Sequence, residues 1–364
     1  MAKRARRGPS ASTTDSGSES EELARSCISS KKPRQEASSL NKDDAQRSAR
    51  VSEDNASATS TAAGPSTRSD EGMKTFKIFN MNVNGVLKAF ARKEKRLDAL
   101  LKEQDPDIVV LTEMHYDPQA PLKRKEDGMA PYQRFRSRYP YYHNGVNPGA
   151  PGRAGIAVYS KTKPLSIIKS GLPTFDNPAS TKGRFIQFEY DDFYLVAVYS
   201  FHSGNSDKLD AHEVRKKWDA ALRKYLHRLD KVKPVICVGD QNVAPTNDDV
   251  FKATGKLNHK PIQGCILQHE REAWFDLLKA REGSDESSFL DTWRAKHPDE
   301  TKVFTHTSVD GTLNFFSGFR LDHFVISERL LPKVTSCEIL SEETAMSDHI
   351  PIVLVLESSI SSPA

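Results

Sequence analysis

Short apolar runs in this sequence repeatedly end in side chains that can bind a cation, move a proton or hold an anion. Each run reads as a buried strand, and strand ends are rigid places for reactive groups. The polar residues at these ends are Asn80, Asn82, Asn84, Glu113, Tyr199, Asp240, Asn242, Asp322, Asp348 and His349. Any one of them could simply shape a turn, but so many ends with related chemistry indicate a common site.

These carboxylates, amides, one phenol and one histidine suit the hydrolysis of a phosphodiester. The substrate is an anion that gathers more negative charge in the transition state. Its cleavage therefore needs a divalent cation on oxygen ligands, an activated water and donors around the phosphate. The sequence has no Cys/His cluster for zinc, no Gly-rich nucleotide loop and no Gly-x-Ser-x-Gly turn of a serine hydrolase. A metal-dependent phosphodiesterase is favoured.

The elements that must position these residues form an α+β pattern. Strands are expected at residues 75–79, 108–111, 155–160, 185–190, 193–199, 235–238, 321–327 and 350–356. Helical spacing occurs around residues 97–101, 211–229 and 270–281. The longest helix has an apolar face made by Val214, Trp218, Leu222, Tyr225, Leu226 and Leu229. Many strands without strict alternation with helices predict two packed sheets covered by helices.

Composition divides the 364 residues into a tail and one domain. Residues 1–72 consist mainly of Ser, Thr, Ala and charged residues, so we expect a disordered tail. Residues 73–357 are apolar enough to bury one core, and residues 358–364 form a short C-terminal tail. The formal net charge is only +4, so any nucleic-acid partner would have to bind to a local basic face. No apolar run is long enough for a membrane span.

Two basic clusters lie in the tail, at residues 3–7 (KRARR) and 31–34 (KKPR). Such stretches serve as nuclear import signals or nucleic-acid arms, or they are simply solvated charges. We expect nuclear localisation, with an import receptor or repair proteins as partners of the tail. The four cysteines are scattered, which disfavours a disulfide framework.

Five motifs resemble those of the exonuclease III-like AP endonucleases of the endonuclease/exonuclease/phosphatase superfamily, in the same order. They are residues 80–85 (NMNVNG), 111–113 (LTE), 239–245 (GDQNVAP), 318–322 (GFRLD) and 347–351 (SDHIP). The resemblance covers residues 75–356 and implies a DNase I-like, four-layered α/β/β/α sandwich. It also implies a monomeric enzyme that uses Mg²⁺, or Mn²⁺ in its place. That enzyme would cleave duplex DNA 5′ to abasic sites and clean or trim blocked 3′ ends.

The resemblance further implies the roles of individual residues. Asp240, helped by Asn242, is expected to orient or deprotonate the attacking water. His349, held by Asp322, is expected to donate to the scissile phosphate, and Tyr199 to stabilise the phosphate charge. The metal is expected to be held or surrounded by Glu113, Asn82, Asp240, Asn242, Asp348 and His349. Substrate contacts are expected from Asn84, Lys88, Arg92, Arg153, His202, His306, Phe319 and Arg320.

Several positions depart from the usual motifs of this family. Thr112 and His115 stand where Gln and Lys are common around the metal-binding Glu. His202 replaces an amide expected at the phosphate and could donate if protonated. Phe319 replaces a Trp of the pocket for the base-free sugar, and His306 lies near where another aromatic is expected. Because pocket shape separates abasic from intact nucleotides, a wider pocket would favour exonuclease or 3′-end cleaning.

Two alternatives remain open from the sequence. One is another enzyme of the superfamily, such as an RNA 3′-exonuclease or a phosphoesterase for small phosphates. Residues 243–245 (VAP) and the motif at 318–322 argue for the repair branch instead. The other is a catalytically inactive DNA-binding adaptor, which the intact Glu113, Asp240, Asp322 and His349 disfavour.

Overall fold

The computed structural model describes residues 75–91, 97–116, 129–147, 152, 154–204, 209–252, 264–310, 315–343 and 346–357. The expected tails, and the substrate contacts expected at Arg92 and Arg153, lie outside the described residues. The described residues form two six-stranded sheets and one three-stranded sheet.

The first sheet contains both ends of the domain. Its strand order is β14-β15-β1-β2-β4-β3. The bounds are β14 Val334–Ile339, β15 Ile352–Glu357, β1 Thr75–Asn82, β2 Ile108–Thr112, β4 Ile156–Ser160 and β3 Tyr141–Gly145. Only β1 and β2 run parallel, while the other neighbouring pairs are antiparallel.

The second sheet has the order β10-β13-β8-β7-β6-β5. Its strands are β10 Phe289–Asp291, β13 Asp322–Ser327, β8 Val235–Asp240, β7 Tyr194–Tyr199, β6 Phe185–Glu189 and β5 Ser166–Ile168. Here β7 and β8 form the parallel pair. The small third sheet joins β11 His306–Asp310, β12 Phe315–Phe319 and β9 Val250–Lys252.

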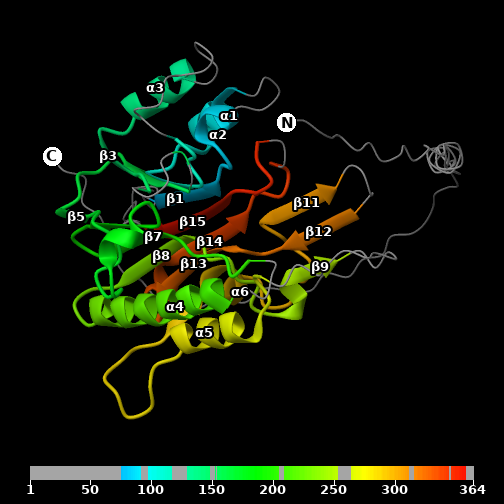
Figure 1. Ribbon diagram of the computed structural model, residues 1–364. Coiled ribbons are helices and arrows are strands. Elements are labelled where there is room, and N and C mark those ends of the chain that lie inside the picture. The colour runs from blue at the N-terminus through cyan, green and yellow to red at the C-terminus, as the bar shows by residue number, and fades with distance from the viewer. Residues whose placement is uncertain are drawn as a thin grey trace, which may run out of the picture. The chain divides into compact units, whose positions relative to one another are not determined.

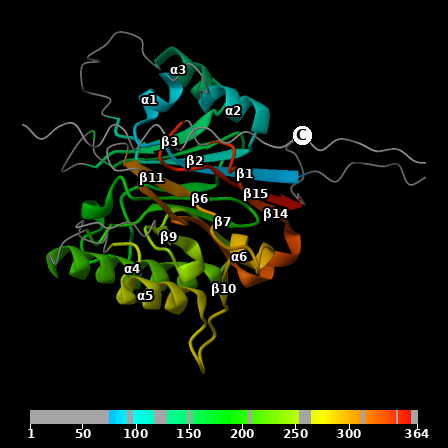
Figure 2. The ribbon, with the colours of Figure 1, turned by 90° about the vertical axis from the view of Figure 1, so that its right-hand side faces the viewer.

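Helices cover the outer faces of the two large sheets, as Figures 1 and 2 show. Helices α1 Val86–Ala91, α2 Leu97–Gln104 and α3 Met129–Ser137 pack on the first sheet. Helices α4 Leu209–Asp230 and α5 Gln268–Leu278 pack on the second, and the short α6 is Thr292–Lys296. Between the sheets lies a shared core, with Ile78 and Val110 from one and Ala197 and Val238 from the other. The α/β/β/α sandwich predicted from the sequence is thus confirmed.

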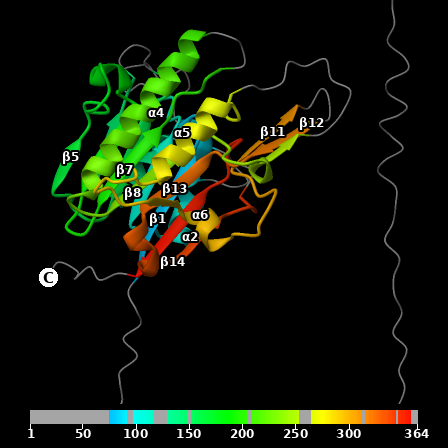
Figure 3. The same cartoon turned by 90° about the horizontal axis from the view of Figure 1, so that it is seen from below.

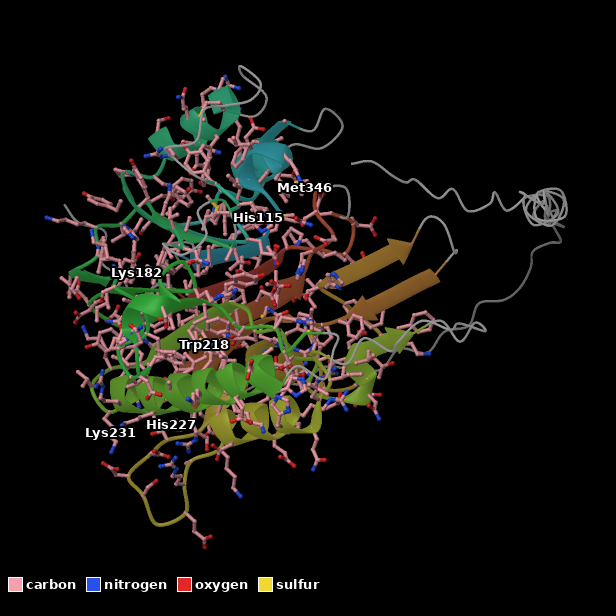
Figure 4. The ribbon with its side chains drawn as sticks, viewed as in Figure 1. His115, Lys182, Trp218, His227, Lys231 and Met346 are labelled. Carbon is pink, nitrogen blue, oxygen red and sulfur yellow. The ribbon has the colours of Figure 1, made fainter. Side chains whose placement is uncertain are left out.

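Helix α4 packs on the second sheet beside α5 (Figure 3). Its apolar face buries Trp218, Leu222 and Leu226, as the sequence predicted. Trp218 lies between α4 and this sheet (Figure 4), and its indole N–H donates to the Ser200 Oγ at 2.9 Å. The prediction was wrong for Val214, which is 38% exposed, whereas the neighbouring Arg215 is buried.

Strand register explains why the polar strand ends meet. In the parallel pair β1/β2, Asn82 aligns with Thr112, directly before Glu113. In β7/β8, Tyr199 aligns with Asp240, and the antiparallel β13 starts with Asp322 opposite the same Asp240. Both parallel pairs therefore end at the same edge of the sandwich. Among the described helices, none is both long and apolar enough to cross a bilayer.

Candidate active site

A pocket of about 330 Å³ opens where these strands end. It is lined by Glu113, Tyr199, His202, Asp240, Asn242, Cys265, His306, Phe319, Leu321, Asp348 and His349. The structure therefore brings together most of the site residues predicted from the sequence. Cys265 was missed because no motif surrounds it, whereas Leu321 lies within the 318–322 motif and could have been inferred.

A single amide joins two of the three acidic groups of the pocket. The Nδ2 of Asn82 donates to Glu113 Oε1 at 2.9 Å and to Asp240 Oδ2 at 3.0 Å. The Tyr199 hydroxyl donates to the same Glu113 oxygen at 2.8 Å. The Asn82 Oδ1 accepts the backbone N–H of Asn84, so the amide cannot rotate freely. Asn82 thus fixes the positions of two carboxylates in a buried setting.

The donor set fits a divalent cation. Ligand atoms of Glu113, Asp240 and His349 lie within 4.8 Å of one another. Burial raises the pKa of Asp240 to about 7, and the negative charges of Asp322 and Glu113 add to this effect. Carboxylates held this close repel one another, and a bound cation would relieve that repulsion. Glu113 and Asp240 would hold such an ion through oxygen atoms.

Asn242 and Asp348 occupy different surroundings within the pocket. The Asn242 backbone N–H donates to Asp240 Oδ1 at 2.9 Å, while its side-chain amide donates to the Ser200 carbonyl. Asp348 is 41% exposed, and both of its carboxylate oxygens accept from Asn84 Nδ2 at 3.2 Å. Asn242 therefore orients Asp240 directly, and the metal-ligand roles of Asn242 and Asp348 stay predictions.

His349 and Asp322 form a buried pair on the other side of the carboxylates. The His349 Nδ1 lies 2.7 Å from Asp322 Oδ2, and Asn80 Nδ2 donates to the second Asp322 oxygen at 3.3 Å. Burial alone would lower the pKa of His349, but the charge and hydrogen bond of Asp322 outweigh it and raise that pKa to about 10. His349 is therefore an imidazolium at neutral pH, and its Nε2–H is left for the pocket. In this charge state Nε2 has no lone pair for a metal ion, so the predicted metal-ligand role of His349 is disfavoured and Glu113 and Asp240 are the candidate ligands.

This pair predicts a pH dependence of the metal-free protein. The folded pKa of His349, about 10, exceeds the ordinary value of 6.5, so its contribution to stability is complete below pH 6.5. That contribution is lost as the pH rises from 6.5 toward 10. An NMR titration of the His349 ring should give a pKa near 10, falling strongly in Asp322→Asn. A wild-type value near 6.5 would contradict the pairing.

The far wall of the pocket comes from the third sheet. His306 on β11 pairs with Phe319 on β12 and also forms a bridge to His349. Its ring centroid lies 4.7 Å from that of His349 and 6.1 Å from that of Phe319. Burial and the nearby His349 charge lower the pKa of His306 to about 4, so this imidazole is neutral at pH 7. The wall thus combines one apolar ring with one neutral polar ring.

His115 lies beside Glu113 although no role was predicted for it. Its Nε2 lies 3.3 Å from Glu113 Oε2, the oxygen that Asn82 and Tyr199 leave free. Figure 4 shows His115 on the α1 side of the domain. The only sequence signal was its position two residues after Glu113, where the family commonly has Lys.

The prediction that Arg320 contacts DNA is wrong, because this side chain is fully buried. Its Nε donates to Asp249 Oδ1 at 2.7 Å and its Nη1 to Asp291 Oδ2 at 2.8 Å. The guanidinium also lies 5.0 Å from the Trp293 ring. Two carboxylates balance the positive charge of Arg320 inside the protein, so this charge is not available to bind a phosphate. Lys88 is exposed on α1, and its contact with DNA stays a prediction.

Comparison with known proteins agrees with this geometry. The model of the Endonuclease/Exonuclease/phosphatase family matches residues 79–349. The chain is 34% identical to the DNA repair nuclease APEX1 of Danio rerio over 293 residues, 80% of this chain and 85% of that protein. It is 31% identical to an exodeoxyribonuclease of Bacillus subtilis (strain 168) over 282 residues, 77% of this chain and 99% of that protein.

Solved structures show the same fold. An AP endonuclease from Archaeoglobus fulgidus superposes with a TM-score of 0.59 at 23% identity, covering 78% of this chain and 100% of that one. The AP endonuclease LMAP from Leishmania major superposes with a TM-score of 0.60 at 21% identity, covering 80% and 91%. The chain therefore belongs to the endonuclease/exonuclease/phosphatase family, in its exonuclease III-like AP endonuclease branch.

Proposed function

We propose that this protein is a Mg²⁺-dependent endonuclease that cleaves duplex DNA on the 5′ side of an abasic site. The observation that carries the proposal is the arrangement of Glu113 and Asp240, tied together by Asn82, beside the imidazolium of His349. Acidic oxygens on one side and a cationic donor on the other suit an anionic phosphodiester whose charge grows during hydrolysis. The adjoining pocket supplies room for a sugar.

Different residues of the site perform different steps of the hydrolysis. Asp240 is fixed through both oxygens by Asn82 and the Asn242 backbone, so it orients the attacking water and accepts its proton. His349 donates its Nε2–H to the phosphate, and Asp322 holds the ring and its charge. Tyr199 is neutral, because burial and the Glu113 charge raise its pKa, and its hydroxyl fixes Glu113. A divalent cation, when bound, would neutralise charge on the phosphate and the leaving oxygen.

The proposed preference for an abasic sugar rests on the pocket walls. Phe319 and Leu321 form an apolar surface, and both are almost completely buried. A sugar that has lost its base can leave the duplex at low cost and would fill a small apolar pocket better than an intact nucleotide does. The relatives that match this chain carry names of DNA repair nucleases and exodeoxyribonucleases, which supports DNA as the substrate.

We also propose removal of blocked 3′ ends or 3′ nucleotides as a second activity of the same site. This second activity is supported by His306, whose neutral, polar imidazole lies in a pocket wall that would otherwise be apolar. Such a wall tolerates a hydroxyl or a small polar blocking group at a 3′ end.

A panel of labelled substrates tests these assignments. It includes a duplex with a tetrahydrofuran abasic analogue, a duplex with a 3′-phosphoglycolate, an intact duplex with a recessed 3′ end, and a single-stranded RNA. We expect the highest kcat/KM on the abasic duplex, with measurable activity at the blocked end. A preference for RNA, or for the intact duplex, would replace the proposed substrate with one of the alternatives.

Asn82→Ala is expected to weaken Mg²⁺ and Mn²⁺ binding about 10–100-fold, because partners that orient metal ligands contribute that much to affinity. Without this amide, Glu113 and Asp240 lose their common donor and their fixed positions. Calorimetric titration of the metal-free protein measures the effect independently of activity. The exposed Asn177→Ala serves as a matched control with unchanged affinity. Equal affinity in Asn82→Ala and wild type would contradict a cation site here.

For the tail we propose nuclear import through the two basic clusters, with the protein acting as a monomer. The support is the sequence of residues 3–7 and 31–34 alone. A fluorescent fusion of the full chain, compared with a variant carrying Ala throughout both clusters, tests this in cells. Cytoplasmic retention of the wild-type fusion would contradict it.

A further inference from the structure

We propose that Arg184 is a positioning residue of the active site, which holds Tyr199 in place and whose positive charge limits the affinity of the carboxylates for a divalent cation while it favours the anionic substrate. Because it concerns the same site, this role rests on the proposed phosphodiesterase function. No role was predicted for Arg184 from the sequence.

Arg184 lies directly across the second sheet from Tyr199. It precedes β6 by one residue, and its carbonyl accepts the backbone N–H of Tyr199 at 2.9 Å. Its side chain returns to the same place, where Nη1 donates to the carbonyl oxygens of Tyr199 and Ser200 at 3.1 and 3.3 Å. The Ser200 carbonyl also accepts the side-chain amide of Asn242. One guanidinium nitrogen thus fixes the end of β7, from which Tyr199 reaches Glu113.

Two aromatic rings cover the same guanidinium. Its carbon Cζ lies 4.6 Å from the centroid of the Tyr199 ring and 4.2 Å from that of the Phe201 ring. The Phe201 ring in turn packs against Trp218, with 5.5 Å between the ring centroids, so the core supports its position. An aromatic face attracts a cation, and rings that exclude water let the charge of that cation act over a longer distance. The charge of Arg184 is therefore held in place and poorly screened.

This charge has no carboxylate partner of its own. Among the described residues, no carboxylate forms an ion pair with Arg184, whereas the buried Arg215 pairs with Asp219 at 2.8 Å. Burial lowers the pKa of Arg184, and the negative charges of Asp240 and Glu113 act against that shift. The guanidinium stays charged at neutral pH. Its positive potential therefore acts on the two carboxylates that are expected to hold the cation.

A fixed positive charge beside these carboxylates has two opposite effects. It repels a divalent cation, so the cation binds less tightly than the carboxylates alone would allow. It attracts the phosphodiester, whose negative charge grows during hydrolysis, so it favours cleavage. Loss of this charge should therefore tighten cation binding and slow cleavage. A general loosening of the site would instead weaken cation binding and slow cleavage, so the two causes can be distinguished.

Arg184→Gln removes the charge but keeps an amide that can donate to the carbonyl of Tyr199. We expect this variant to bind Mg²⁺ and Mn²⁺ about 3–10-fold more tightly, because one unit of opposing charge is lost. Its single-turnover rate on the abasic duplex should fall about tenfold, less than for loss of a donor that contacts the phosphate itself. Arg184→Lys keeps the charge and should keep the wild-type cation affinity and most of the rate. Lys182→Gln removes a cation two residues earlier and is the matched control, with both quantities unchanged.

Calorimetric titration of the metal-free proteins measures the affinities, and cleavage with enzyme in excess measures the rates. Should thermal unfolding show that Arg184→Gln does not fold, Phe201→Leu takes its place. That variant exposes the guanidinium to water, so both quantities should shift in the same directions by a smaller factor. Unchanged or weaker cation binding in the variant, or a rate in Arg184→Lys as low as in Arg184→Gln, overturns the inference. Wild-type protein that neither binds a cation nor cleaves would refute the proposed function, and the role of Arg184 with it.

Discussion

Asp240→Asn should lower the single-turnover rate of cleavage about 10³–10⁴-fold, the upper part of the range for loss of a general base. An amide has nearly the same shape as the carboxylate, but it cannot accept the water proton and is a weaker metal ligand. Asp240 Oδ1 and Oδ2 each accept from a fixed donor, so the amide nitrogen of Asn would also face one of those donors. The rate is measured with enzyme in excess over a labelled abasic duplex.

The effect of Asp240→Asn on folding can be measured separately from its effect on the cleavage rate. Burial and neighbouring negative charge raise the pKa of Asp240 to about 7. The ionised side chain therefore destabilises the folded state of the metal-free protein. Thermal unfolding of metal-free Asp240→Asn should therefore occur at the wild-type temperature or above it. The exposed Asp191→Asn is a matched control and should keep the wild-type rate. If Asp240→Asn retained about a tenth of the wild-type rate or more, Asp240 would not be the general base.

Arg320→Met should reduce the free energy of unfolding by about 3–5 kcal/mol, the cost of leaving buried charges without their partner. Asp249 and Asp291 both lose a short hydrogen bond and a positive charge inside the protein. Burial alone would raise the pKa of Asp291, but Arg320 holds that pKa well below its ordinary value. Urea unfolding near neutral pH measures the loss.

The matched control for this prediction is Arg134→Met, an exposed arginine on α3. It should change stability by no more than about 0.5 kcal/mol. A similarly small effect of Arg320→Met would contradict the buried network. Arg320 lies between Phe319 and Leu321, so destabilisation should also disturb the pocket wall. Acidification in Arg320→Met should recover part of the lost stability as the unpaired carboxylates become protonated.

The sequence was sufficient to predict the inner strands of the two large sheets and most of the catalytic edge, but not the edge strands β3, β5, β10 and β14. Buried strands such as β2 and β8 are continuous apolar runs that end in one or two polar residues, so their type and end points are visible without a structure. The parallel pairing of β1 with β2 and of β7 with β8 then places those ends together. Residues that act at strand ends were therefore easy to identify.

Contacts between distant segments could not be predicted in the same way. Arg320 was predicted to contact DNA because its buried partners Asp249 and Asp291 lie 71 and 29 residues away, where no local pattern reveals them. The contact of Arg184 with the carbonyl of Tyr199 likewise joins residues 15 positions apart. No residue pattern encodes such contacts. The third sheet was not predicted either, because β9, β11 and β12 are short and lack a clear alternation.

The most direct test of the central claim is a mapping of the cut on a duplex with one tetrahydrofuran abasic analogue. The duplex is labelled at the 5′ end of the damaged strand and incubated with Mg²⁺ or with EDTA. We predict a single Mg²⁺-dependent product that ends in a 3′-hydroxyl directly 5′ to the analogue, and no product with EDTA. A cut on the 3′ side, a cut that persists in EDTA, or an intact abasic strand would contradict it.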